Sequence, residues 1–508
     1  MLFGSLTFVW LFLPLAVGAV FIVPRPWRNA VLLLESLVFF AWGEPRFLLP
    51  LVGGCLFDYV IARHLGGGRA AGSPRSRNTL CAIGVAANVL ALGYYKYAGF
   101  AMEGMNALFT AAGLDCVLPP VRVALPLGIS FFTFQKISYL VDVRRGMVAP
   151  APSFPRYLLY ILLFPQLTMG PIVRYHEIAD QFAERTVTAE SFLQGLWRFA
   201  LGLARKTLVA GPLADISAAA FRVTDGGGSL SAVSAWLGLY AYTLQIYFDF
   251  AGYCDMAVGI GRMFGFRFPE NFDAPYIARD MGEFWRRWHI TLGAFMKEYL
   301  YIPLGGNRCS RSRSLLNNWI VFLVSGIWHG AAWNFVVWGA WHGLWIVFAK
   351  LFRPRRRTMP RAPCSMHEGK SLPAPPAVPR LPFSTISPAR VAGMGWTFLM
   401  VMLGWVFFAA ADFPSATAYF RSLAGCAHAG ASLLADFTPQ AACAMAAGTL
   451  LSFLPALAPW FGIADWRLGD HASAAAVWSR TLATGLLLLL ATLPLLTSGF
   501  SPFIYNRF

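Results

Sequence analysis

Apolar runs of membrane-spanning length recur along the chain, and short polar or basic stretches separate them. Runs near twenty residues are long enough to cross a bilayer as helices. The strand-type alternation of a membrane barrel is absent from the sequence. The pattern therefore predicts an all-α polytopic membrane protein. Candidate membrane segments lie at 6–23, 29–43, 46–62, 79–98, 122–141, 156–172, 191–211, 232–260, 315–331, 332–351, 391–411, 440–459 and 479–498.

Basic connections set the expected orientation of these segments. They lie at 63–77, 144–156 and 350–361, and the positive-inside rule assigns them to the cytoplasm. An odd number of segments separates the second from the third. We therefore expect that 156–172, which Pro165 and Gly170-Pro171 interrupt, is not a true span. On this count both termini lie on the side of the membrane opposite to the cytoplasm.

Composition and charge agree with a membrane location. Of 508 residues, 57% are hydrophobic and only 13% are charged, which is less charge than a soluble surface needs. The net charge is +17. Because the basic residues fall between apolar runs, contact with anionic lipid explains them better than nucleic acid, which we do not expect as a partner. The eight cysteines form no C-x-x-C or Cys/His cluster, so no metal site is predicted.

Composition shifts divide the chain into three parts. We expect a transmembrane core over 1–352, a cytoplasmic linker rich in Pro, Arg and Ser over 353–390, and further transmembrane helices over 391–508. The linker is interpreted as a tolerated insertion rather than a docking segment. Within the core, 262–314 interleaves charged and aromatic residues, which predicts amphipathic helices at the interface or along a polar cavity.

Two histidines in tryptophan-rich sequence are the main candidates for chemistry. His329 ends a predicted helix in Ser325-Gly-Ile-Trp-His-Gly, and His289 follows Trp285-Arg-Arg-Trp on an expected amphipathic helix. A neutral buried imidazole can take a proton from a hydroxyl. The residues alone leave alternatives open, namely a hydrogen-bonded structural imidazole at His329 and a polar tip at the interface for His289. His342 is expected well away along a helix, in a structural role.

Charged residues near these histidines admit two interpretations each. Arg286 and Arg287 contact either lipid phosphate or an anionic donor such as coenzyme A. Asp249 and Asp255 are intramembrane acids that either pair with Arg262 or the two arginines or line a hydrophilic path, and we expect a supporting role rather than catalysis. The sequence has no G-x-S-x-G, Walker A or dinucleotide-binding motif in a suitable context.

Long ordered motifs resemble the membrane-bound O-acyltransferase (MBOAT) superfamily, and most of all its alginate O-acetyltransferase (AlgI-like) branch, a relative of the D-alanyl transfer protein DltB. The motifs are Leu125-Pro-Leu-Gly-Ile-Ser-Phe-Phe-Thr-Phe-Gln, Phe164-Pro-Gln-Leu-Thr-Met-Gly-Pro-Ile, Tyr247-Phe-Asp-Phe-Ala-Gly-Tyr-Cys-Asp-Met-Ala, Pro269-Glu-Asn-Phe-Asp-Ala-Pro-Tyr, Phe284-Trp-Arg-Arg-Trp-His-Ile-Thr-Leu, Tyr299-Leu-Tyr-Ile-Pro-Leu-Gly-Gly-Asn-Arg, Ser325-Gly-Ile-Trp-His-Gly and Ser501-Pro-Phe-Ile-Tyr. The resemblance spans nearly the whole chain, with departures at 353–390 and 412–480.

The resemblance implies a ring of transmembrane and re-entrant helices around a central tunnel. It implies that His329 is the catalytic base, that His289 supports it, and that no cofactor is permanently bound. The donor would be acetyl-coenzyme A or another acyl thioester from the cytoplasm, and periplasmic acetyltransferase proteins would be partners in acetylating an extracellular polysaccharide such as alginate. Residues expected to bind substrate or donor, or to line the tunnel, are Trp285, Arg286, Arg287, Trp288, Trp328, Asn334, Asp249 and Asp255.

The sequence alone is also compatible with two other functions. Acyl transfer to another envelope polymer, a lipid or a protein, with D-alanine among the acyl groups, belongs to the same superfamily. A transporter of an acyl donor or glycan, with the histidines as a proton relay, belongs to another class.

Overall fold

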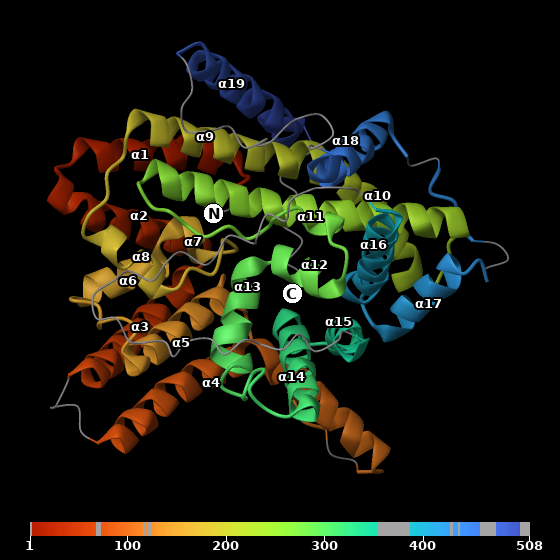
Figure 1. Ribbon diagram of the computed structural model, residues 1–508, viewed down its shortest axis with the longest axis horizontal. Coiled ribbons are helices and arrows are strands. Elements are labelled where there is room, and N and C mark those ends of the chain that lie inside the picture. Colours follow the sequence, from red (N-terminus) through yellow and green to blue (C-terminus); the bar gives the residue numbers. More distant parts are fainter. Residues whose placement is uncertain are drawn as a thin grey trace.

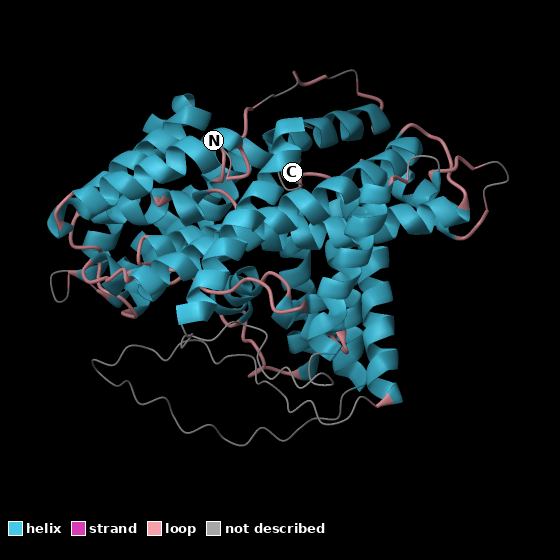
Figure 2. Ribbon diagram, turned by 90° about the horizontal axis from the view of Figure 1, so that it is seen from above, coloured by secondary structure: helices cyan, strands magenta, loops and turns pink. Residues whose placement is uncertain are grey.

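The chain folds into helices, as the computed structural model shows over residues 3–67, 73–114, 117–119, 123–352, 387–426, 430–434, 437–457 and 474–497. Among these residues the only β-type contact is a single bridge between Leu230 and Ala431. Figure 2 shows the helices packed into one body. The predicted all-α fold is confirmed. Most of the predicted linker, 353–386, lies outside the described residues.

The α-helices follow the predicted apolar segments closely. Their bounds are α1 Leu13–Ile22, α2 Arg28–Gly43, α3 Pro45–Gly66, α4 Pro74–Ala111, α5 Ile129–Arg145, α6 Phe154–Leu162, α7 Phe164–Leu167, α8 Tyr175–Ile178, α9 Ala189–Ala204, α10 Gly211–Asp225, α11 Ala232–Met263, α12 Met281–Arg287, α13 Ile290–Phe295, α14 Arg311–His329, α15 Trp333–Phe352, α16 Pro388–Ala409, α17 Phe413–Leu423, α18 Pro439–Leu457 and α19 Ala474–Thr497. Short π-helical stretches include η5 Arg205–Ala210, which joins α9 to α10. The helices α8, α10 and α17 were not predicted.

Within the part of the chain that the structure describes, four helices are long and apolar enough to cross a membrane by themselves. They are α3, α4, α16 and the Trp478–Leu496 part of α19. The interrupted stretch 156–172 is two short helices, α6 and α7, which Leu163 separates. Its side chains are buried, so protein covers the irregular backbone, as membrane depth requires.

The helices α9 and α11 form the central seam of the molecule, and Figure 1 shows them side by side across its upper half. Glycines seven residues apart on each helix meet in pairs. A Cβ atom at Gly252 would lie 2.6 Å from the Gly202 carbonyl oxygen, and one at Gly259 would lie 2.6 Å from that of Gly195. Small residues allow backbones to approach this closely in membranes. The seam holds α11 in place, and α11 carries part of the histidine site.

Candidate active site

His329 is the last residue of α14, a helix that Ser310 caps at its other end. After Gly330 the chain turns back into α15, and the two helices touch through Gly326 and Gly339. This close approach brings an α15 residue, Trp338, against the imidazole, with ring centroids 4.9 Å apart. The predicted position of His329 at a helix end is confirmed.

Aromatic rings enclose the His329 imidazole, and the residue is only 5% exposed. Besides Trp338, its ring contacts Trp328 at 4.7 Å and Phe408 of α16 at 5.3 Å between centroids. Three helices, α14, α15 and α16, therefore contribute to this pocket. Such surroundings exclude bulk water and favour the neutral imidazole that a general base requires.

His289 lies between the short helices α12 and α13, in the left-handed region of the backbone with φ of +46°. A non-glycine residue in this region is strained, and such strain is found most often at functional sites. The side chain is only 1% exposed. The expectation that His289 continues an amphipathic helix is wrong, and so is the alternative of an interfacial polar tip. The short α12 ends at Arg287, before the histidine.

Hydrogen bonds to Asn271 fix the tautomer of His289. The backbone N–H and the hydroxyl of Thr291 both donate to Asn271 Oδ1, at 3.1 and 2.9 Å, so this oxygen is an acceptor. His289 Nδ1 lies 3.1 Å from the same oxygen and must therefore carry the hydrogen. Its Nε2 then presents a lone pair. That nitrogen is buried and has no hydrogen-bond partner among the described residues.

One indole brings the two histidines into a single site. The ring of Trp328 lies 4.7 Å from that of His329 and 6.2 Å from that of His289. Phe250 of α11 packs edge-on against His289 at 4.8 Å. Residues about forty positions apart in the sequence thus meet in one buried cluster of rings around Trp328, which we call the histidine chamber.

Unpartnered nitrogens surround this chamber. Among the described residues, the indole N–H groups of Trp285, Trp328, Trp338 and Trp405 lack a hydrogen-bond partner, as do both ring nitrogens of His342. A buried polar group without a partner costs about 1–3 kcal/mol. A cluster of such groups around two imidazoles is typical of a site that binds a polar molecule.

His342 lies closer to the site than a continuous helix would place it. Because the chain reverses after Gly330, the ring of His342 packs against Trp338, the same indole that contacts His329, with centroids 4.9 Å apart. It also packs against Trp285 at 5.0 Å. The expectation that it lies well away is wrong, since it assumed one unbroken helix.

The intramembrane acids pair with bases that the sequence did not suggest. Lys206 binds Asp249 at 2.5 Å, and both side chains are buried. Arg198 binds Asp255 at 2.7 Å, and Arg205 also binds it. The predicted pairing with Arg262, Arg286 or Arg287 is wrong. The two acids lie on α11. Their basic partners lie on α9 and on η5, the π-helical stretch that follows α9, so the ion pairs join the two sides of the seam.

Of the remaining predicted site residues, some contact the aromatic rings around the histidines and others stabilise the neighbouring helices. Arg287 pairs with Glu283 at 3.0 Å and Asp273 at 3.3 Å, while Arg286 is exposed. Trp288 is buried against Trp405 with centroids 5.0 Å apart. The amide of Asn334 donates to the Ala410 carbonyl at 2.8 Å, which ties α15 to the end of α16. Of the predicted set, Trp328 contacts the rings of both His329 and His289, whereas Trp285 contacts the ring of His342.

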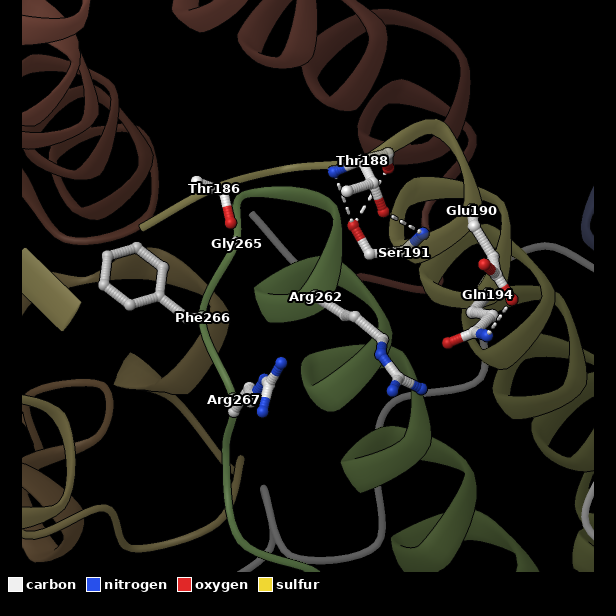
Figure 3. Close-up of a pocket in the computed structure, with 9 residues that line it drawn as sticks. All are labelled: Thr186, Thr188, Glu190, Ser191, Gln194, Arg262, Gly265, Phe266 and Arg267. Carbon is white, nitrogen blue, oxygen red and sulfur yellow. Dashed lines mark hydrogen bonds between the residues drawn. The ribbon is translucent and has the colours of Figure 1, made fainter. Parts of the chain in front are cut away.

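A separate cavity of about 220 Å³ opens where α9 begins and α11 ends. Figure 3 shows the guanidinium groups of Arg262 and Arg267 on one side and the hydroxyls of Thr188 and Ser191 on the other. Arg262 is twelve residues beyond Phe250 on α11, which is about 18 Å along the helix axis. This cavity is therefore not the histidine chamber, and no histidine lines it.

Three residues at the site were not predicted from the sequence, namely Asn271, Lys96 and Tyr97. Asn271 orients His289, and the two α4 residues bind the end of α14 that carries His329. A signal for Lys96 existed, because a lysine within an apolar run of membrane length is costly and therefore marks function. Asn271 stands inside a motif quoted above but shows no chemistry of its own in the sequence.

The fold and the site define a multi-pass membrane protein with two buried histidines in one aromatic cluster. The chain belongs to the membrane-bound O-acyltransferase family, MBOAT, whose profile matches residues 125–367. It is 35% identical to a probable alginate O-acetylase AlgI from Azotobacter vinelandii, over all of both chains. The chain is accordingly an O-acyltransferase.

Relatives with lower identity include a peptidoglycan O-acetyltransferase and a teichoic acid D-alanyltransferase. A peptidoglycan O-acetyltransferase from Helicobacter pylori is 33% identical over 84% of this chain and 80% of its own length. A teichoic acid D-alanyltransferase from Bacillus subtilis is 28% identical over 44% of this chain and 59% of its own length.

Replacing Asn271 with alanine is expected to lower the rate of acyl transfer about tenfold or more, because His289 would lose the bond that orients it. Thr291 would lose its acceptor at the same time. Asn106→Ala, which removes two hydrogen bonds to the Leu118 backbone and none to a histidine among the described residues, is the matched control. Initial rates with a labelled thioester check this, and a parental rate in Asn271→Ala would show that the orientation of His289 does not matter.

Proposed function

We propose that this enzyme moves an acetyl group from a cytoplasmic thioester, acetyl-coenzyme A, toward the O-acetylation of an extracellular polysaccharide such as alginate. The polymer is suggested by the similarity to the Azotobacter vinelandii alginate O-acetylase, which covers the full length of both chains. The observation that carries the chemistry is the pair of buried imidazoles around Trp328.

In the proposed reaction, a nitrogen of His329 takes the proton of an acceptor hydroxyl. At the same time the hydroxyl oxygen attacks the carbonyl carbon of the thioester. The tetrahedral intermediate collapses, the carbon–sulfur bond breaks, and the leaving thiolate receives the proton from the imidazolium. His289 offers only a lone pair at Nε2, so it does not stabilise negative charge. It suits accepting a hydrogen bond from a donor group of the acceptor other than the hydroxyl whose proton His329 takes, and this bond would orient the acceptor. The unpartnered indole N–H groups are the donors available to the oxyanion.

The proposal includes a location and partners. The basic connections support a cytoplasmic entry for the donor, with the protein in a bacterial inner membrane and both termini in the periplasm. A tunnel across the membrane would join the two sides at the histidine chamber. The acceptor would be a hydroxyl on a periplasmic acetyltransferase partner, which passes the acetyl group to the polymer.

The test uses purified protein in lipid vesicles with acetyl-coenzyme A labelled in the acetyl group and a membrane-extracted acceptor fraction. We expect label to become covalently attached to an acceptor as an ester that mild alkali releases. Label that crosses the membrane without any covalent product would support the transporter instead. Label accepted only from activated D-alanine would support D-alanyl transfer, in keeping with the Bacillus subtilis relative.

A further inference from the structure

The carbonyl groups at the end of α14 need partners from outside the helix. The last carbonyls of any helix lack intrahelical donors, and at membrane depth an unsatisfied carbonyl is costly. Two consecutive residues of α4 supply the donors. The Tyr97 hydroxyl donates to the Ile327 carbonyl at 2.6 Å, and Lys96 Nζ donates to the carbonyls of Trp328 at 2.5 Å and His329 at 3.1 Å.

A positive charge is not needed merely to satisfy these carbonyls, since Tyr97 does so with a neutral hydroxyl. An ammonium group is expensive within a helix apolar enough to cross a membrane, as α4 is. Lys96 Nζ also lies 5.9 Å from the centre of the Trp328 ring, the indole that both histidines contact. It interacts electrostatically with the His329 imidazole as well. The cost of an ammonium group in this apolar helix, and its position beside the Trp328 ring, point to a role for Lys96 in the site.

We propose that Lys96 is a positioning residue for His329, a role that rests on the proposed function of that histidine. Its ammonium fixes the backbone of Trp328 and His329 together, so the imidazole and the shared indole keep one arrangement toward the acceptor. A cation at the C-terminal end of a helix also stabilises the final turn. Loss of the two bonds frees that turn, and a displacement of about 1 Å in a catalytic group can cost about 100-fold in rate.

The experiment measures kcat and KM for labelled acetyl-coenzyme A with the full-length protein in lipid. Lys96→Met is expected to lower kcat about 10- to 100-fold while KM stays near the parental value. Lys96→Arg keeps a charged donor and is expected to restore most of kcat. Tyr97→Phe removes the neighbouring bond to Ile327 and should lower kcat less. Lys297→Met, at an exposed lysine, is the matched control.

A parental kcat in folded Lys96→Met, with His329→Ala inactive in the same assay, would overturn the positioning role and leave the proposed function standing. Parental transfer by His329→Ala would instead overturn the proposed function. Should Lys96→Met fail to fold, the folded Lys96→Arg variant decides. A kcat close to the parental value supports the role, and a kcat as low as that of His329→Ala refutes it.

Discussion

Replacement of His329 by alanine is expected to reduce acetyl transfer by about 100- to 10,000-fold, the range that one general base contributes. The imidazole is buried among Trp328, Trp338 and Phe408, so water is poorly placed to act as the base in its stead. Initial rates of ester formation from labelled acetyl-coenzyme A measure the effect.

Two further variants separate the chemistry of His329 from its packing. His329→Gln keeps a polar side chain of similar size but provides no base, so it should be as inactive as alanine and melt near the parental temperature. His64→Ala changes an exposed histidine on α3 and should keep the parental rate. A folded His329→Gln variant that transferred acetyl at the parental rate would show that another group takes the proton.

Replacement of Asp249 by leucine is expected to destabilise the protein by about 3–5 kcal/mol, because it leaves the Lys206 ammonium buried without its carboxylate. Both side chains lie in the seam between α11 and the π-helical η5. The loss should appear as a lower melting temperature of the purified protein in detergent, with transfer falling in step with the folded fraction.

The double variant Asp249→Leu/Lys206→Met provides the control. Replacing a buried ion pair with apolar groups of similar volume is often neutral, so the double variant should regain most of the lost stability. If it also regains transfer, Asp249 supports the fold and takes no part in the chemistry. A double variant that stays fully folded but inactive would instead place the Lys206–Asp249 pair in the reaction.

The helices could be predicted because a membrane span needs about twenty apolar residues, and this requirement is written in the local sequence. The observed α14 and α15 thus match the predicted 315–331 and 332–351 to within a few residues. The short amphipathic α17 was missed because it lacks such a run. The division of 156–172 was predictable from Pro165 and Gly170-Pro171, since these residues interrupt helices.

The two histidines of the site could be predicted from the sequence, but the residues that position them could not. A histidine in an apolar run is visible in the sequence, whereas the partner of a buried group depends on how the chain packs. Lys96 lies more than two hundred residues before His329, and no local pattern connects them. The wrong partners for Asp249 and Asp255 have the same cause, because α9 and η5 precede α11 by tens of residues.

The backbone at His289 could not be predicted either. Its left-handed conformation is imposed by the surrounding contacts, among them those of Asn271 with the imidazole and Thr291. His289 was expected at the polar edge of a helix, but its side chain is buried. Its Nδ1 faces Asn271, so the Nε2 lone pair is directed away from Asn271.

The central claim is that one chamber formed around Trp328 carries out covalent acetyl transfer with His329 as the base. The most direct measurement is a single-turnover reaction of the vesicle-embedded protein with labelled acetyl-coenzyme A and its acceptor, followed by mass analysis of the acceptor. The account predicts one acetyl ester on an acceptor hydroxyl with the parental protein and none with folded His329→Gln. An ester formed equally by both proteins, or label that crosses the membrane without forming an ester, would contradict it.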